Sequence, residues 1–553
     1  MSTESDSPTV RKIAPQYDSR GNPQWQSRMT APDNSIARAL MVPDRIIPVI
    51  FVPGVMGSNL KGTGAAKAMR WRLDSTTTML PWFGMSPERR KRILTPDTMT
   101  VDDDGLLPQG TRQTQEELRR RKWGEVGAIS YSEILVWLEN ALSDFEAPHD
   151  GERAALLKAD LQALVGEARL TNDEVSLSYR YRFPVHACGY NWLADNALSS
   201  RRLADRIDEI RERYKSDHLL CDKVILVTHS MGGMVARHCS EVLNYKDKIL
   251  GIVHGVMPTI GAAAVYRRLK AGADGPWAAS MVLGHDAAAM TASLAASPGP
   301  LQLLPTAEYG NGWLKIVDAK QSFSFPDNGD PYGQIYAVRG KWWSMCEQDL
   351  INPSNQETRP EKSQAQLDRD WADYAKMIKA QIKDFHVQTA GKFHPVTYAF
   401  CGSGKDTKSM SYGTVTWSGG PAGVGGLLYL NRSKDVLDAR PLQPSELSDD
   451  KDEQQPELGM GRTVEAKFSD GGFFPEVQQH FRLSDPDEAG DGTVPLRSGV
   501  SPKSHCTAFA EATVRHEPAY KLSESEENRR VCRFALRAIV QIAQGVQKTS
   551  LKY

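Results

Sequence analysis

The chain has 553 residues, of which 40% are hydrophobic and 24% are charged, and its formal net charge is −1. This length suffices for one large α/β domain with insertions, or for several domains. The near-zero charge gives no electrostatic reason to expect nucleic acid as a partner. No apolar run approaches the ~18 residues of a membrane span, so we expect no transmembrane segment.

The N-terminal region, residues 1–43, is polar and rich in Pro, Ser, Asp and Asn, which predicts a loosely packed arm. It contains no apolar core of the kind that a secretory signal peptide needs, so we expect none. The seven cysteines are odd in number and scattered, without a C-x-x-C pair. Reduced thiols are therefore expected, and no zinc site.

Residues 44–262 alternate between apolar strands and amphipathic helices. Ile46–Val52 is the first strong strand and runs into a Gly/Pro turn, residues 115–170 look mainly helical, and Val224–Val227 is a continuous aliphatic run. Parallel strands buried on both faces have this unbroken Val/Ile character. The pattern predicts an α/β fold, a mostly parallel sheet with helices on both faces.

The pattern changes after Gly261. Residues 263–395 are rich in Ala and largely helical, which predicts a cap inserted over one end of the sheet. Strand character returns at Val396–Cys401, so residues 396–553 should complete the core. Within them, residues 409–480 are rich in Gly, Asp and Ser and predict an insertion of loops and hairpins.

The predicted cap contains a short apolar stripe. Its members are Trp277, Met281, Val282 and Leu283. The stripe could cover an acyl channel and open at a membrane surface. Ordinary packing between helices explains the same pattern equally well.

A candidate nucleophile stands at Ser230, in the stretch VTHSMGG that follows the aliphatic run. Strand, sharp turn and helix are the context of the Gly-x-Ser-x-Gly nucleophile elbow, although Thr228 occupies the position of the first glycine. Gly232 and Gly233 would let the following helix pack closely behind the turn. The alternative is a core serine in a tight strand–helix junction.

A serine nucleophile needs a base and an acid, and on this fold they follow it in the order acid, then His. Asp491 precedes a glycine late in the chain, and His516 is the last histidine, ahead of the closing helix. Asp491 could instead be a turn residue, with Asp485 and Asp487 as nearby alternatives. The rival base is His505.

Backbone amides must also hold the oxyanion of a tetrahedral intermediate. One donor should be Met231, directly after the nucleophile, and the second Val55, in the loop after the first strong strand. His229 is expected to be structural. We predict no catalytic metal and no required cofactor, although residues 485–492 carry a weak hint of structural calcium without the EF-hand spacing.

Several stretches resemble lecithin:cholesterol acyltransferase-like lipases and phospholipases, which are α/β-hydrolases. In chain order they are FVPGVMGSNL, GYNW, VTHSMGG, SPGPLQLLPT, YAFCGSGKDT and GDGTVPLRS. GYNW departs from the Tyr-Asp-Trp-Arg often found there. The resemblance implies an α/β-hydrolase with Ser230, Asp491 and His516 as its triad and Val55 and Met231 at the oxyanion hole.

More narrowly, the chain resembles bacterial lipase effectors of type VI secretion. That likeness implies manufacture in the bacterial cytoplasm, export by a non-Sec route into the periplasm of target cells, a phospholipid membrane surface as substrate, a secretion-machinery component as partner and a cognate immunity protein. A phospholipase A is thus the leading prediction. The alternatives are an acyltransferase with the same triad and a non-catalytic lipid- or protein-binding module.

Overall fold

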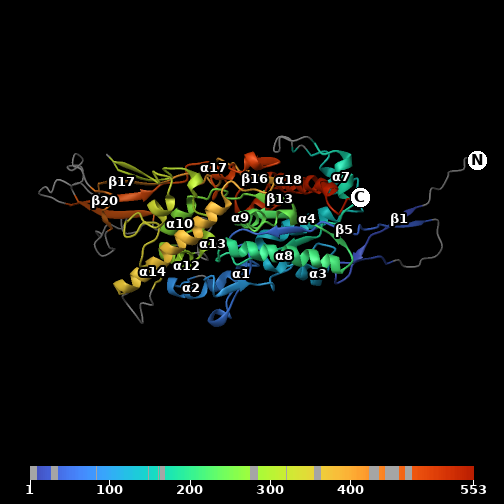
Figure 1. The fold of residues 1–553 in the computed structure, drawn as a ribbon, viewed down its shortest axis with the longest axis horizontal. Coiled ribbons are helices and arrows are strands. Elements are labelled where there is room, and N and C mark those ends of the chain that lie inside the picture. Colours follow the sequence, from blue (N-terminus) through green and yellow to red (C-terminus); the bar gives the residue numbers. More distant parts are fainter. Residues whose placement is uncertain are drawn as a thin grey trace, which may run out of the picture.

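The structure is a computed structural model and describes residues 9–552. The exceptions are residues 27–34, 83, 147, 160, 162–168, 274–283, 285, 319–320, 354–362, 422–434, 442–459 and 468–475. The molecule is elongated, with strand β1 (Val10–Ile13) near one end and helix α14 (Gln364–Met377) near the other (Figure 1). None of the described helices is long and apolar enough to cross a membrane.

A six-stranded parallel sheet forms the centre of the molecule. Its spatial order is β10 (Val185–Ala187), β6 (Val49–Val52), β12 (Val224–His229), β13 (Ile249–Gly255), β16 (Thr397–Gly402) and β21 (Ala508–Ala512). Every neighbouring pair runs parallel. Strands β6, β12, β13 and β16 are buried along their whole length, as their mainly apolar sequences predict.

Helices cover both faces of this sheet. Alternate side chains of the strands pack with α4 (Ala128–Leu142) and α18 (Glu526–Ala543) on one face. The other face packs against α8 (Asn196–Ser216) and α9 (Met231–Arg237). The amphipathic sequences of these helices supply the buried stripes, and Asp195 caps α8 by accepting a hydrogen bond from the Ala197 amide.

The order of the strands reverses between β6 and β12. From β6 the chain crosses to β10 on one side, and it then returns to build β12, β13, β16 and β21 on the other side. In open α/β sheets, ligands bind outside the carboxyl ends of the strands at such a switch point. The loops that follow β6 and β12 therefore occupy the position where a site is expected.

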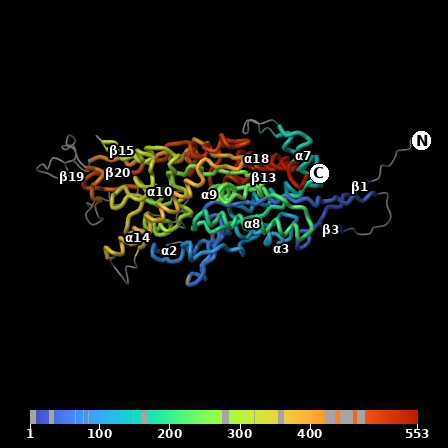
Figure 2. The backbone as a smooth tube through the Cα atoms, in the orientation of Figure 1, coloured from blue at the N-terminus to red at the C-terminus, as the bar shows by residue number. Residues whose placement is uncertain are grey.

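A second six-stranded sheet lies beyond the first and was not predicted. Its spatial order is β15 (Ser322–Phe325), β14 (Leu314–Val317), β17 (Val415–Pro421), β20 (Glu476–Leu483), β19 (Gly461–Lys467) and β18 (Arg440–Pro441). The predicted cap supplies β14 and β15, and the predicted loop insertion supplies most of the rest. Figure 2 shows β15, β19 and β20 together at one end of the molecule.

The second sheet shares a separate apolar core with the cap helices. This core includes Tyr266 and Leu269 of α10 (Ala264–Ala271), together with Trp342 and Trp417. The expected cap is thus helical in part and also contains strands. The N-terminal arm likewise holds short strands, and β1 pairs in parallel with β4 (Ile36–Ala39).

Candidate active site

Ser230 stands in a sharp turn between β12 and α9. Its backbone has φ 52° and ψ −124°, a conformation that costs a non-glycine residue energy and that persists only where the surroundings impose it. A Cβ added to Gly232 would lie 2.4 Å from the carbonyl oxygen of Val52. Glycine is therefore what lets α9 start directly against the end of β6, and this is the geometry of a nucleophile elbow.

His516 and Asp491 complete a chain of hydrogen bonds with Ser230. The Nε2 atom of His516 is 2.8 Å from Ser230 Oγ, and its Nδ1 atom is 2.8 Å from Asp491 Oδ2. A carboxylate can only accept, so Nδ1 carries the proton and Nε2 accepts the serine hydroxyl. Ser230 and Asp491 are both buried, so the serine hydroxyl and the carboxylate are shielded from water.

Asp491 is itself held by the backbone. Its Oδ1 atom accepts hydrogen bonds from the amides of Thr493 at 2.9 Å and Val494 at 2.7 Å. A Cβ added to Gly402 would lie 2.5 Å from the Asp491 Cβ, which places the carboxylate against the carboxyl end of β16. Thus three loops from distant parts of the chain converge at one edge of the sheet.

The alternative acid and base lie elsewhere. Asp487 accepts hydrogen bonds from the amides of Gly413 and Thr414, at 2.8 and 3.0 Å. His505 is exposed and stacks on Phe393, with 4.6 Å between the ring centroids. The structure brings together Ser230, His516 and Asp491, the three residues preferred in the sequence analysis.

The two candidate oxyanion donors flank the serine. Met231 is the first residue of α9, where the amide has no partner within the helix. Val55 follows Gly54, and a Cβ added to Gly54 would lie 3.0 Å from the Ser230 Cβ. Among the described residues, neither amide has a hydrogen-bond acceptor. Both amides therefore remain available for the predicted oxyanion role.

Two further residues around the serine make contacts that sequence reasoning missed. His229 was expected to be structural, yet its ring joins the hydroxyl of Tyr131 to the carbonyl of His516. Burial, together with the nearby His516, lowers the pKa of His229 to about 4, so the ring is neutral near pH 7. Thr228 hydrogen-bonds to Nδ1 of His254 at 2.9 Å, which explains why a threonine fits the buried strand end.

The remaining predicted site residues lie outside the described residues. They are the members of the apolar cap stripe, Trp277, Met281, Val282 and Leu283.

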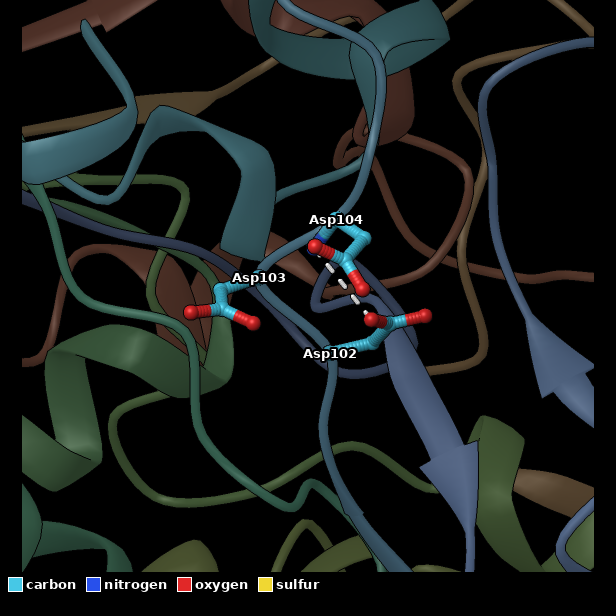
Figure 3. A group of neighbouring side chains, drawn as sticks. All are labelled: Asp102, Asp103 and Asp104. Atoms are coloured by element: carbon cyan, nitrogen blue, oxygen red, sulfur yellow. Dashed lines mark hydrogen bonds between the residues drawn. The ribbon is translucent and has the colours of Figure 1, made fainter. Parts of the chain in front are cut away.

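A group of three carboxylates, Asp102, Asp103 and Asp104, is the one set close enough to share a metal ion among the described residues (Figure 3). Asp102 is fully buried and pairs with Arg72 at 2.7 Å. Lys61 lies 3.9 Å from Asp102 and 3.5 Å from Asp103. Arg70, Lys122 and Arg119 also pair with this group, so nearby cations balance the negative charge, which favours a structural ion-pair cluster.

The segment with a weak calcium signal is also rich in internal bonds. Glu488 pairs with Arg497, and Asp487 and Asp491 accept from amides and from His516 as described above. Donors of this kind compete directly with a cation for carboxylate oxygens.

Comparison with known proteins gave a family match and matches to solved structures. The family described as the PGAP1-like alpha/beta domain matches residues 196–268, which run from the start of α8 into α10. A chain in the crystal structure of the Tle4–Tli4 complex superposes with a TM-score of 0.69 and 24% sequence identity, covering 90% of this chain and 98% of that chain. No curated protein matches the sequence.

The chain has the α/β-hydrolase fold. The parallel sheet, its helical faces and the helical insertions agree with the fold predicted from the sequence, which is confirmed. The similarity to the solved structure covers 90% of the chain. The resemblance in fold therefore extends beyond the short motifs.

Proposed function

We propose that the chain is a serine carboxylester hydrolase of the phospholipase A type, acting on membrane glycerophospholipids. The hydrogen-bonded series Ser230–His516–Asp491 at the switch point of the sheet carries this proposal. Hydroxyl, imidazole and carboxylate in this order are the arrangement that activates a serine for acyl transfer.

In the first half of the reaction, Ser230 Oγ attacks the acyl carbonyl carbon and passes its proton to His516 Nε2. Asp491 keeps the imidazole oriented and stabilises its charged form. The amides of Val55 and Met231 hold the oxyanion, and one such donor contributes ~3 kcal/mol to the transition state.

The intermediate then collapses to an acyl-enzyme. The lysophospholipid oxygen leaves and takes the proton from His516. Water attacks the acyl-enzyme with His516 as base, which releases the fatty acid and restores the serine hydroxyl. Each step uses side chains and amides of this chain, so no cofactor is required.

The choice of substrate and setting rests on likeness. The sequence resembles type VI lipase effectors, and the similar solved chain belongs to a complex of Tle4 with Tli4. We therefore infer an antibacterial effector that is delivered to the periplasm of a target cell by a non-Sec route, with a secretion-machinery component as partner. By the same likeness, a cognate immunity protein binds and neutralises it.

The test compares release of free fatty acid from phosphatidylethanolamine and phosphatidylglycerol vesicles by wild type and Ser230→Ala. We expect release by wild type and none by the variant. Equal release would contradict the proposal. Binding without release by either protein would indicate a lipid-binding module, and acyl esters of an added alcohol without free fatty acid would indicate an acyltransferase.

A further inference from the structure

A series of four buried groups connects the two loops that flank Ser230. The Gly54 amide donates to the hydroxyl oxygen of Tyr131 at 3.1 Å. The same hydroxyl lies 3.0 Å from Nδ1 of His229, and Nε2 of His229 lies 2.9 Å from the carbonyl oxygen of His516. The series thus begins beside the Val55 amide and ends on the backbone of the proposed base.

The direction of every hydrogen bond in this series follows from its ends. A carbonyl oxygen can only accept, so Nε2 of His229 carries the proton and donates to His516. In the neutral ring Nδ1 must then accept, which makes Tyr131 the donor. The Tyr131 oxygen still has a lone pair for the Gly54 amide. Tyr131 and His229 therefore each donate one hydrogen bond and accept one, and no donor or acceptor of the series is left unmatched.

The backbone of His516 is consequently fixed on both sides. Its amide donates to the carbonyl oxygen of Asp491 at 2.8 Å, while its carbonyl accepts from His229. His229 directly precedes the nucleophile in the chain. The rings of His229 and Tyr131 also pack at 5.6 Å between centroids, so the connection is buried and rigid.

We infer that His229 and Tyr131 are positioning residues that hold His516 and the Val55 loop in register with Ser230. This inference rests on the proposed function. Neither side chain reaches the reacting atoms; they act through the backbone of residues 54 and 516. A displacement of ~1 Å at a reacting group can cost about 100-fold in rate, so such a connection matters for turnover more than for substrate binding.

The experiment measures kcat and KM for p-nitrophenyl ester hydrolysis, with the melting temperature of each variant. Tyr131→Phe removes only the hydroxyl that joins the two loops. We expect a fall in kcat of about 10- to 100-fold with KM nearly unchanged. The matched control is Tyr374→Phe in α14, which removes another buried tyrosine hydroxyl, bonded at 2.9 Å to the carbonyl of Tyr336 in the core of the second sheet. It should keep the wild-type kcat.

Two substitutions of His229 test the two hydrogen bonds of its ring one at a time. His229→Gln places an amide donor near the former Nε2 and can still bond to the His516 carbonyl, whereas His229→Asn places its amide nearer Tyr131. We expect Gln to retain more of the wild-type kcat than Asn. A merely structural role would lower the melting temperature of both without this ranking in kcat.

The outcomes distinguish this inference from the proposed function. If Ser230→Ala is inactive while Tyr131→Phe matches Tyr374→Phe in kcat, the positioning role is wrong and the hydrolase remains. If Ser230→Ala keeps the wild-type rate, both are wrong. An inactive Ser230→Ala, a reduced kcat only in Tyr131→Phe and the Gln-over-Asn ranking together support the inference.

Discussion

The two six-stranded sheets are built on different principles. The central sheet is wholly parallel, and its inner strands are buried along their length. The second sheet mixes parallel and antiparallel pairs, and β14 and β15 alternate between more and less buried positions. Every proposed catalytic residue lies at the carboxyl edge of the central sheet. We therefore expect substitutions to be tolerated better in the second sheet than at the carboxyl edge of the first.

The largest difference in turnover is expected when one buried carboxylate is replaced near each sheet. Asp491→Asn keeps the size of the side chain but no longer stabilises the charged imidazole, so kcat should fall on the order of 10⁴-fold. Asp318→Asn, which alters a carboxylate directly after β14 that bonds to Gln479, is the control and should retain turnover. Ester hydrolysis by purified, folded protein measures both. Similar losses would remove the functional distinction between the sheets.

Acid should destabilise both regions through their buried histidines. Burial lowers the pKa of His229 and His386 to about 4 and of His254 to about 3. Below about pH 6.5 the unfolded chain binds protons that the folded chain does not, so stability is lost as pH falls from 6.5 towards 4. The free energy of unfolding should fall on the order of a few kcal/mol over this window, and the melting temperature should fall with it. A melting temperature that stays constant between pH 6.5 and pH 4 would contradict this expectation.

The two sheets should differ in how well a glycine in each tolerates an added methyl group. Gly232→Ala would place a Cβ 2.4 Å from the Val52 carbonyl oxygen, whereas Gly420 in β17 has no heavy atom within 4 Å of such a Cβ. We expect Gly232→Ala to cost about 1–3 kcal/mol by overpacking and to slow turnover by shifting the elbow. Gly420→Ala should be close to neutral. Equal melting temperatures for the two variants would argue against the close approach at Gly232.

The smallest expected effect concerns the unusual threonine of the elbow. Thr228→Val preserves shape but leaves Nδ1 of His254 without its partner, which should cost about 1 kcal/mol of stability. Activity of the folded protein should be retained, because the hydroxyl points to His254 and not to Ser230. Chemical denaturation and ester hydrolysis check the two halves of this expectation. A large loss of kcat at unchanged stability would give the hydroxyl a catalytic role.

The sequence predicts the central sheet well because its signals are local. The aliphatic run Val224–Val227, the glycines after Ser230 and the order of Ser230, Asp491 and His516 can each be read without knowing the contacts. The second sheet could not be predicted in this way. Its parallel pair joins Leu314–Val317 to Val415–Pro421, about a hundred residues later, and nothing in either segment specifies that partner.

The same limit applies to the connection behind the triad. Tyr131 lies 77 residues from Gly54 and 98 residues from His229, in a helix whose sequence reads as ordinary core. Only the folded arrangement reveals that its hydroxyl bridges two loops. His229 stands beside the serine, but the carbonyl that it contacts belongs to His516, 287 residues later in the chain.

The central claim is that His516 activates Ser230 as a nucleophile. Its most direct test is covalent labelling of the wild type by a fluorophosphonate, with the modified residue located by peptide mass spectrometry. We predict a single adduct on Ser230 and almost no adduct in His516→Ala, while His505→Ala labels like the wild type. Labelling of Ser230 at an equal rate in His516→Ala, or an adduct on another residue, would contradict the activation of Ser230 by His516.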